Sequence, residues 1–432
     1  MSIIIIGAGP VGCFTAKILG EAGIKVKVYE KNAKEMVKKN VGTIHFDQKD
    51  YSILGLPPLT KESKCYIGTF EKLWQVPLDE TKKFAIDYPT DILYMNEFVS
   101  YLASLAEQTG NVTFHYNAPF ESAITEGSKV VGAIIGGNIG RVDSDLLIDC
   151  SGMWAIVRNS LPEACDVPKL IAREERIFTL HMERWRCFSE FPQGSNTYCC
   201  YKGFANQTGE NETLVGASSL KGWDFTRILF NEMIKVQKLN SIKHELIETL
   251  QGEVPYDFPP FSLVGDGFLS IGDSAFQNKP FNGEGMASGM KAARLALPVI
   301  EQAIKKQDFS RNALWQYNVS FFRGFGADFA MIRSTGETLV ELTPEEFNWM
   351  FENGFVDKTM MESTWNTYKA KTGAKIVIMA LKGLKRWPLF KKIVAGIMLG
   401  NKLQKLYKKY PKKPQNLFDW VTSFNHLMKN HS

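Results

Sequence analysis

The sequence lacks the features of a membrane-spanning or secreted protein. No apolar run reaches the roughly 18 residues that a helix needs to cross a bilayer. The chain opens with Met1-Ser2-Ile3-Ile4-Ile5-Ile6-Gly7, without the charged segment and the cleavage site of a secretory signal. We therefore expect a cytoplasmic protein.

Metal-ligand and disulfide patterns are also missing. The seven cysteines show no Cys-x-x-Cys spacing and no Cys/His ligand spacing, and the six histidines are scattered along the chain. An odd number of cysteines in a cytoplasmic chain is typical of reduced thiols. We expect neither a zinc site nor a disulfide framework.

Charge is ordinary in amount but uneven in position. Hydrophobic residues make up 44% and charged residues 22% of the chain, which excludes a disordered or fibrous protein. Residues 375–414 hold eleven lysines, one arginine and no acid, so the rest of the chain has 39 basic against 46 acidic residues. A basic segment on an acidic body indicates one anionic partner surface. Because only one arginine is present there, we do not expect nucleic-acid binding.

The apolar pattern predicts an interrupted α/β sheet. Short apolar runs predict strands at 3–6, 25–29, 112–116, 130–135, 145–149 and 268–271. Periodic segments predict helices at 13–22 and 97–108, and a third helix that follows Gly272-Asp273 and ends at about residue 305. Between 172 and 260 the pattern favours strands, with one amphipathic helix around 225–251. Beyond residue 308 the chain is mainly helical.

The first chemical motif is Gly7-Ala8-Gly9-Pro10-Val11-Gly12, placed between the first strand and helix. Gly7 permits a tight turn, Gly9 lets a pyrophosphate approach the backbone, and Gly12 allows close helix–strand packing. Glu30 ends the second strand, where its carboxylate can accept both hydroxyls of an adenosine ribose. This motif alone does not separate NAD from FAD.

A second motif separates the two cofactors. The strand 268–271 leads into Gly272-Asp273, and the stretch 280–286 contains Gly283-Glu284-Gly285-Met286. Asp273 can hold the hydroxyls of a ribityl chain, and the following helix start directs backbone N–H groups at the charge of a reduced flavin. We therefore predict FAD.

A third stretch, 148–158, argues against two other flavin chemistries. Aromatic flavoprotein hydroxylases carry an Asp-Gly pair here, whereas this chain has Ser151-Gly152 and keeps only Val157-Arg158. The Trp-x-Trp-x-x-Pro stretch of flavin halogenases is also missing.

Over nearly its whole length the chain resembles the archaeal geranylgeranyl reductase family, FAD enzymes that saturate the isoprenoid chains of membrane lipids. The broader motifs are the Gly-rich start, Arg158 with Leu161-Pro162, and Gly272-Asp273; the narrower ones are Asp308-Phe309-Ser310, Leu314-Trp315, Leu406-Tyr407, Tyr410-Pro411, Pro414, Leu417 and Trp420. The resemblance implies FAD contacts at Val11, Glu30, Gly42, Ala118, Asp273, Gly285 and Met286.

Two departures from the family concern the proton route. Asn40-Val41-Gly42 stands where the family has Pro-Cys-Gly, so Val41 replaces its thiol, and Tyr198-Cys199-Cys200-Tyr201 keeps only the first Tyr of an aromatic channel stretch. An isolated C=C needs a positioned acid and a dry environment besides a hydride. The candidate proton donors are Tyr198, Cys199, Cys200 and His45. Each has a structural alternative, as a buried thiol, a loop histidine or channel lining.

The basic segment leaves two interpretations open. Pro388 is predicted to divide it into two helices, and the second has an apolar stripe (Leu399, Leu403, Leu406, Tyr407, Tyr410) flanked by lysines (402, 405, 408, 409). Such a helix can lie on anionic lipid, where each lysine contributes about 1 kcal/mol. It can equally dock on the body with its lysines in water.

Together these patterns predict an α/β fold: an FAD-binding Rossmann-type domain of the glutathione-reductase/hydroxylase type, an antiparallel substrate sheet and a helical C-terminal region. The expected boundaries are 1–55, 93–169 and 262–305 for the FAD domain, 56–92 and 170–261 for the substrate domain, and 306–432 for the helices. We expect reduction of prenyl-lipid C=C bonds, with ferredoxin or NADPH as electron donor and membrane contact through 375–414. A flavin monooxygenase and a non-catalytic prenyl-lipid-binding flavoprotein are the alternatives.

Overall fold

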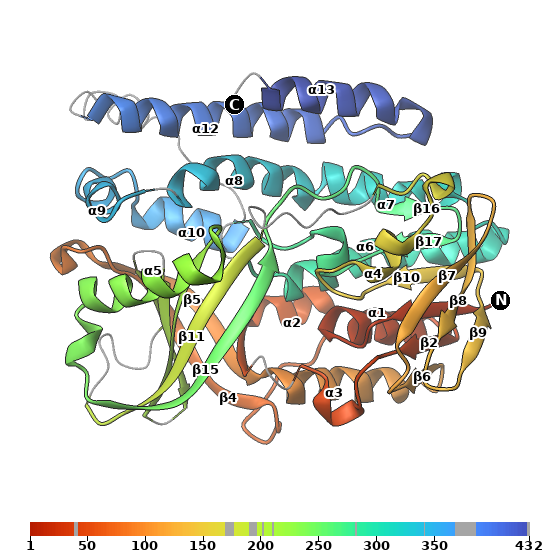
Figure 1. Cartoon of the computed structure of the whole chain (residues 1–432), viewed down its shortest axis with the longest axis horizontal. Coiled ribbons are helices and arrows are strands. Elements are labelled where there is room, and N and C mark those ends of the chain that lie inside the picture. Colours follow the sequence, from red (N-terminus) through yellow and green to blue (C-terminus); the bar gives the residue numbers. More distant parts are fainter. Residues whose placement is uncertain are drawn as a thin grey trace.

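The computed structural model describes residues 1–38, 42–168, 177–189, 197–200, 203–209, 211–280, 283–340, 342–367 and 386–429. Figure 1 shows two sheet regions side by side, with the C-terminal helices stacked above them. The parallel sheet, the largely antiparallel sheet and the helical C-terminal region expected from the sequence are confirmed.

The first sheet has the strand order β16-β17-β10-β1-β2-β6. Its members are β1 (Ile3–Ile6), β2 (Val26–Tyr29), β6 (Val112–His115), β10 (Leu146–Asp149), β16 (Val264–Gly265) and β17 (Phe268–Ser270). All neighbours run parallel except β16 and β17. The carboxyl ends of β1, β2, β10 and β17 therefore meet at one edge, where doubly wound sheets bind their ligands.

Both faces of this sheet are covered, which is why its strands are apolar throughout. Ile3 and Ile5 pack with the helices α1 (Pro10–Glu21), α3 (Met95–Glu107) and α6 (Met286–Lys306). Ile4 and Ile6 pack against a small antiparallel sheet of β7 (Phe120–Glu126), β8 (Lys129–Ile135) and β9 (Gly140–Asp143). Alternation along β1 thus joins two layers to the sheet.

The second sheet has the order β15-β11-β14-β13-β12-β4-β5-β3. Its strands are β3 (Thr43–Asp47), β4 (Tyr66–Gln75), β5 (Phe84–Tyr94), β11 (Ile177–Cys187), β12 (Thr197–Cys200), β13 (Gly203–Gly209), β14 (Glu212–Ser219) and β15 (His244–Pro255). Every pair is antiparallel except β12 with β4. The domain boundaries stay a prediction, but β3, which lies within 1–55, pairs with β5 of this sheet.

The predicted helix around 225–251 is wrong in its second half. The helix α5 (Gly222–Val236) packs on β11 and β14 and ends before Lys238, which adopts a left-handed conformation with φ of 56°. Residues from His244 onward form β15, because the edge of β11 supplies backbone hydrogen-bond partners along its whole length. An open strand edge presents unpaired N–H and C=O groups, and a segment lying along it can pair with them instead of continuing a helix.

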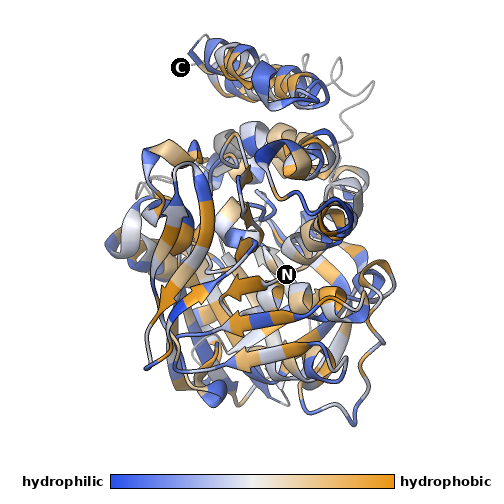
Figure 2. Ribbon diagram, turned by 90° about the vertical axis from the view of Figure 1, so that its right-hand side faces the viewer, coloured by the Kyte–Doolittle hydropathy of each residue, from blue (hydrophilic) through white to orange (hydrophobic). Residues whose placement is uncertain are grey.

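The C-terminal region contains α7 (Arg311–Arg323), α8 (Phe325–Val340), α9 (Pro344–Glu352), α10 (Lys358–Thr367), α12 (Trp387–Tyr407) and α13 (Leu417–Lys429). Helix α12 packs on α8 so closely that a Cβ at Gly400 would lie 2.8 Å from the Met331 carbonyl oxygen. Figure 2 shows α12 and α13 as the outermost layer.

The apolar stripe of α12 faces the body of the protein. Leu403, Tyr407 and Tyr410 are fully buried, and Tyr410 stacks on Phe322 of α7 with ring centroids 4.2 Å apart. Lysines 402, 405, 408 and 409 are exposed. This helix is therefore docked on the body of the protein, with these four lysines exposed to water. Pro388 lies in its first turn, and the basic residues 375–385 lie outside the described part of the chain.

Candidate functional site

The Gly-rich turn between β1 and α1 leaves room for a ligand at one position only. Gly7 has φ of 102°, and a Cβ there would lie 2.5 Å from the Cys150 carbonyl oxygen; a Cβ at Gly12 would lie 2.0 Å from the Gly7 oxygen. A Cβ at Gly9, by contrast, would meet only the Lys38 side chain, at 3.7 Å. Helix α1 begins there without a side-chain cap or an acidic residue. Its first N–H groups suit a phosphate.

Glu30 lies beside this turn, at the end of β2. Its Oε2 accepts a hydrogen bond from the backbone N–H of Ala8 (2.9 Å), and its Oε1 accepts from the backbone of Asn32 (3.0 Å). The backbone N–H of Ala118 donates to the Glu30 carbonyl oxygen at 2.8 Å. Oε1 also accepts from Asn32 Nδ2 (2.8 Å), so the lone pair left for a ribose hydroxyl is on Oε2.

The second predicted motif, at 272–286, packs against the Gly-rich turn in the folded chain. A Cβ at Gly289, in the first turns of α6, would lie 2.6 Å from the Val11 side chain, and one at Gly285 would lie 2.4 Å from Asp273 Oδ1. Gly285 is the N-cap of α6, which has no side-chain cap and no acid in its first turn. A run of backbone and small side chains thus extends from Glu30 past Val11 to Asp273 and Met286. A dinucleotide cofactor requires this kind of cradle.

Lys38 is the residue of this cradle that sequence reasoning missed. Its side chain lies next to Gly9 and within electrostatic reach of Asp273, where it opposes the rise in the Asp273 pKa that burial causes. The sequence does show two consecutive lysines after β2. Nothing in their spacing indicates that the loop folds back over Gly9, because that contact depends on the tertiary structure.

The candidate proton donors fall on two strands of the second sheet. His45 lies on β3, where its ring meets Phe70 edge-on with centroids 5.1 Å apart. Burial lowers the pKa of His45, and the carboxylates of Glu284 and Asp47 partly counteract that effect. Tyr198, Cys199 and Cys200 lie on β12, separated from β3 by β4 and β5, and their side chains are outside the described part of the structure. Tyr201 is outside it too.

Gly42 lies just before β3, at the edge between the two sheets. It has φ of 73°, and a Cβ there would lie 3.0 Å from Arg184 Nη2 of β11. A side chain at this position would be strained by the backbone and crowded by Arg184. Gly283 has φ of 75° and lies in the turn that precedes α6. Both glycines therefore border the region between the FAD cradle and the second sheet.

Arg158 is a structural residue in this fold. Its guanidinium is fully buried and donates to the carbonyl oxygens of Pro168 (2.9 Å) and Ser262 (3.0 Å) and to the Ser270 hydroxyl. The Asp149 carboxylate accepts from the backbone N–H groups of Ser151 (2.9 Å) and Arg158 (3.0 Å). The predicted Ser-Gly turn is thereby fixed. The Arg158 guanidinium is not exposed to a nucleotide.

No cluster of three or more potential metal ligands occurs among the residues that the structure describes. Five cysteines in those ranges (13, 65, 150, 165 and 187) are free thiols. None of the helices described combines the length and apolarity needed to cross a bilayer.

Comparison with known proteins agrees with this geometry. A family model described as FAD binding domain matches residues 1–209. The digeranylgeranylglycerophospholipid reductase of Sulfolobus acidocaldarius is 22% identical, over 99% of this chain and 97% of that protein. Digeranylgeranylglycerophospholipid reductase 1 of Methanopyrus kandleri is 23% identical, over 80% and 92%.

Solved structures share the fold. A geranylgeranyl bacteriochlorophyll reductase-like protein from Thermoplasma acidophilum matches with a TM-score of 0.72 at 16% identity, over 92% of this chain and 99% of that one. A flavin-dependent brominase matches with a TM-score of 0.62 at 18% identity, over 89% and 99%. These likenesses establish the FAD-binding, hydroxylase-like architecture, and the FAD-binding domain establishes the cofactor.

Proposed function

The chain belongs to the geranylgeranyl reductase family of FAD-binding proteins, and from that membership we propose that it saturates isoprenoid C=C bonds of geranylgeranyl membrane lipids or related prenyl chains. The observation that carries the proposal is the match to the Sulfolobus acidocaldarius reductase over 99% of this chain. That match extends through the C-terminal helices, beyond the FAD-binding domain common to many activities.

FAD would be held along the cradle described above. Gly7, Gly9 and Gly12 would let the pyrophosphate approach α1, with Val11 beside it, and Glu30 would accept the ribose hydroxyls near the Ala118 backbone. Asp273 would hold the ribityl chain. Gly42, Gly283, Gly285 and Met286 would border the flavin ring. The open space in front of Gly9 and the contact between Asp273 and Gly285 support this assignment.

When bound and reduced, FAD supplies a hydride; the chain must supply a proton to the other carbon of the double bond. His45 lies on the face of β3 that also carries Asp47, and its neighbours Phe70 and Ile92 are apolar. A histidine with a lowered pKa is a stronger acid when protonated, which favours proton donation in a water-poor environment. Tyr198, Cys199 and Cys200 remain alternative donors.

A lipid assay separates this proposal from its rivals. FAD-loaded protein, dithionite and vesicles containing geranylgeranyl glycerolipids would be incubated without oxygen, and lipid mass would be followed. We expect mass gains in steps of two hydrogens. NADPH-dependent oxygen consumption without any lipid mass change would favour a monooxygenase. A flavin that stays reduced with every prenyl substrate would favour a non-catalytic lipid-binding flavoprotein.

We also propose that the exposed lysines of α12 contact the anionic surface of the membrane that contains the substrate. The apolar stripe of this helix is buried, so the contact would be electrostatic and would weaken with salt. Vesicle sedimentation of the wild type and of a variant with Lys402, Lys405, Lys408 and Lys409 changed to Glu tests it. Equal binding of both proteins to anionic vesicles would contradict it. Ferredoxin or NADPH is the proposed electron donor.

A further inference from the structure

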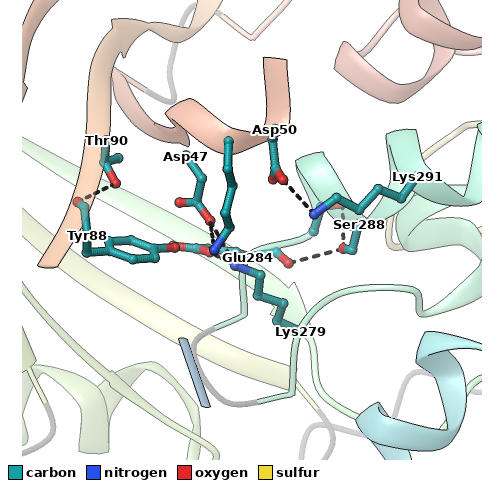
Figure 3. Close-up of polar contacts among 10 residues, drawn as sticks. Asp47, Asp50, Tyr88, Thr90, Lys279, Glu284, Ser288 and Lys291 are labelled. Atoms are coloured by element: carbon teal, nitrogen blue, oxygen red, sulfur yellow. Dashed lines mark hydrogen bonds and ion pairs between the residues drawn. The ribbon is translucent and has the colours of Figure 1, made fainter. Parts of the chain in front are cut away.

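A cluster of six charged side chains lies where β3 and α2 (Gln48–Leu54) meet the turn before α6. Lys279 Nζ lies 2.6 Å from Glu284 Oε2 and 3.7 Å from Asp47 Oδ2, and Lys49 Nζ lies 3.5 Å from the same Asp47 oxygen. Lys291 of α6 pairs with Asp50 of α2 at 2.7 Å. Figure 3 shows both aspartates pointing from β3 and α2 toward lysines of the 279–291 segment.

Most of this cluster is removed from water. The side chains of Asp47 and Lys279 are each 6% exposed, and that of Asp50 is fully buried. Taking such charges out of water costs several kcal/mol per ion, and well-packed apolar residues often serve stability as well or better. Buried ion clusters are therefore candidates for a functional role when they adjoin a site.

The Lys279–Glu284 pair encloses the turn assigned to the flavin. Backbone hydrogen bonds join Lys279 N–H to the Glu284 oxygen and Gly283 N–H to the Lys279 oxygen, each at 2.9 Å. Gly285, which follows Glu284, is the N-cap residue of α6, and no side chain caps this helix end. The two opposite charges therefore flank the backbone proposed to border the flavin ring. His45 lies on the same face of β3 as Asp47, and the carboxylates of Glu284 and Asp47 both act to raise its pKa against the effect of burial.

We propose that Lys279, Glu284 and Asp47 form a charge-tuning site that sets how tightly the protein holds reduced relative to oxidised FAD. Two electrons and one proton convert oxidised FAD into an anionic reduced form. Nearby positive charge stabilises that anion, and nearby negative charge opposes it. Lys279 raises the reduction potential of the flavin, whereas Glu284 and Asp47 lower it.

The pKa of Asp47 is consistent with this network. Burial alone would raise it, yet the ammonium groups of Lys279 and Lys49 and the Tyr88 hydroxyl hold it below its ordinary value. Asp47 therefore stays ionised at neutral pH and keeps Lys279 oriented toward the turn. A neutral amide at position 47 would remove that negative charge with little change in shape.

The test measures the midpoint potential of bound FAD in four single variants, by equilibration with a reference dye without oxygen. We expect K279M to lower the potential and E284Q and D47N to raise it, while K279R stays near the wild type. K279M, E284Q and D47N should each change the ratio of affinities for reduced and oxidised FAD about tenfold, which for a two-electron couple is about 30 mV. Titration with oxidised FAD gives its dissociation constant separately.

A matched control is K17M, which removes another nearly buried, ion-paired lysine, 2.7 Å from Glu21 in α1. Its potential should equal that of the wild type. Shifts of one sign in K279M and E284Q, or no shift beyond that of K17M, would overturn the proposal. If K279M does not fold, the near-isosteric E284Q and D47N decide, since both must raise the potential. The inference rests on the proposed placement of FAD but uses no lipid, so its failure and that of the reductase proposal are distinguishable.

Discussion

The two buried charge clusters of this protein differ in what surrounds them. The Arg158 guanidinium is held by the carbonyl oxygens of Pro168 and Ser262, so its partners belong to the fixed backbone. Lys279 is held by two carboxylate side chains at the edge of the FAD cradle. The first arrangement ties three segments of the FAD-binding region together. The second arrangement contributes little to the stability of the fold that apolar side chains could not contribute as well, which indicates a role in chemistry.

The largest expected effect breaks the first cluster. R158M leaves the carbonyl oxygens of Pro168 and Ser262 without their donor inside the core, and we expect a loss of about 3–5 kcal/mol in the free energy of unfolding. Urea denaturation measures it. The control is R141M, whose exposed pair with Asp143 should contribute less than about 1 kcal/mol. Similar losses in both variants would show that Arg158 is not a structural clamp.

The second cluster should tolerate complete removal better than partial removal. K279M alone removes the ammonium group beside Glu284 and leaves Asp47 with Lys49 at 3.5 Å, so negative charge in the cluster is only partly paired; it should cost about 3 kcal/mol of stability. Adding E284Q and D47N removes that unpaired charge, so the triple variant should recover to within about 1 kcal/mol of the wild type. Additive losses through the series would mean that this cluster, like the first, serves stability.

Glu30 combines the two features compared above, because the backbone anchors its carboxylate and it lies at the proposed FAD site. It is anchored by backbone N–H groups and by Asn32 Nδ2, and one lone pair of Oε2 is left for the proposed ribose hydroxyl. E30Q should raise the FAD dissociation constant about tenfold, because a charged acceptor is worth about 1.5–3 kcal/mol. Fluorescence titration measures this constant, with the exposed Glu21 changed to Gln as control. An unchanged constant would remove Glu30 from the FAD site.

The smallest expected effect is the pH dependence that His45 contributes. Its pKa is lowered from 6.5 in the folded state, so the unfolded chain binds more protons in this range and stability rises with pH. This contribution is fully present above about pH 6.5 and is lost as pH falls toward the lowered value. H45Q should flatten the stability curve between pH 5 and 6.5. An unchanged slope would mean that the ring titrates as it does in water.

Local patterns in the sequence predicted the parts of the fold that depend on neighbouring residues. The strands β1, β2, β10 and β17 end in glycines or acids within a few residues, and these ends form the proposed FAD cradle. The Asp273–Gly285 contact could be expected because both residues flank one strand–helix connection. The same reasoning explains why FAD was predicted correctly as the cofactor.

Features that depend on distant segments could not be predicted in this way. Residues 244–251 of β15 were assigned to a helix because their partners in β11 lie 57 to 70 residues earlier, and periodicity does not reveal that pairing. Lys279 and Asp47 are also brought together only by tertiary structure. Arg158 was interpreted through its motif, whereas its backbone partners lie on other loops. Long-range pairing decided each of these.

The proposed reaction of this FAD-binding chain is the transfer of a hydride and a proton to a prenyl C=C bond. The most direct measurement titrates anaerobically reduced, FAD-loaded protein with a geranylgeranyl glycerolipid and compares flavin reoxidation with saturated double bonds. We expect one saturated bond per oxidised flavin and, when the flavin is reduced in D₂O, two carbon-bound deuteriums per bond, because the hydrogen on flavin N5 also comes from solvent. Flavin that stays reduced, or that is reoxidised without lipid saturation, would contradict it.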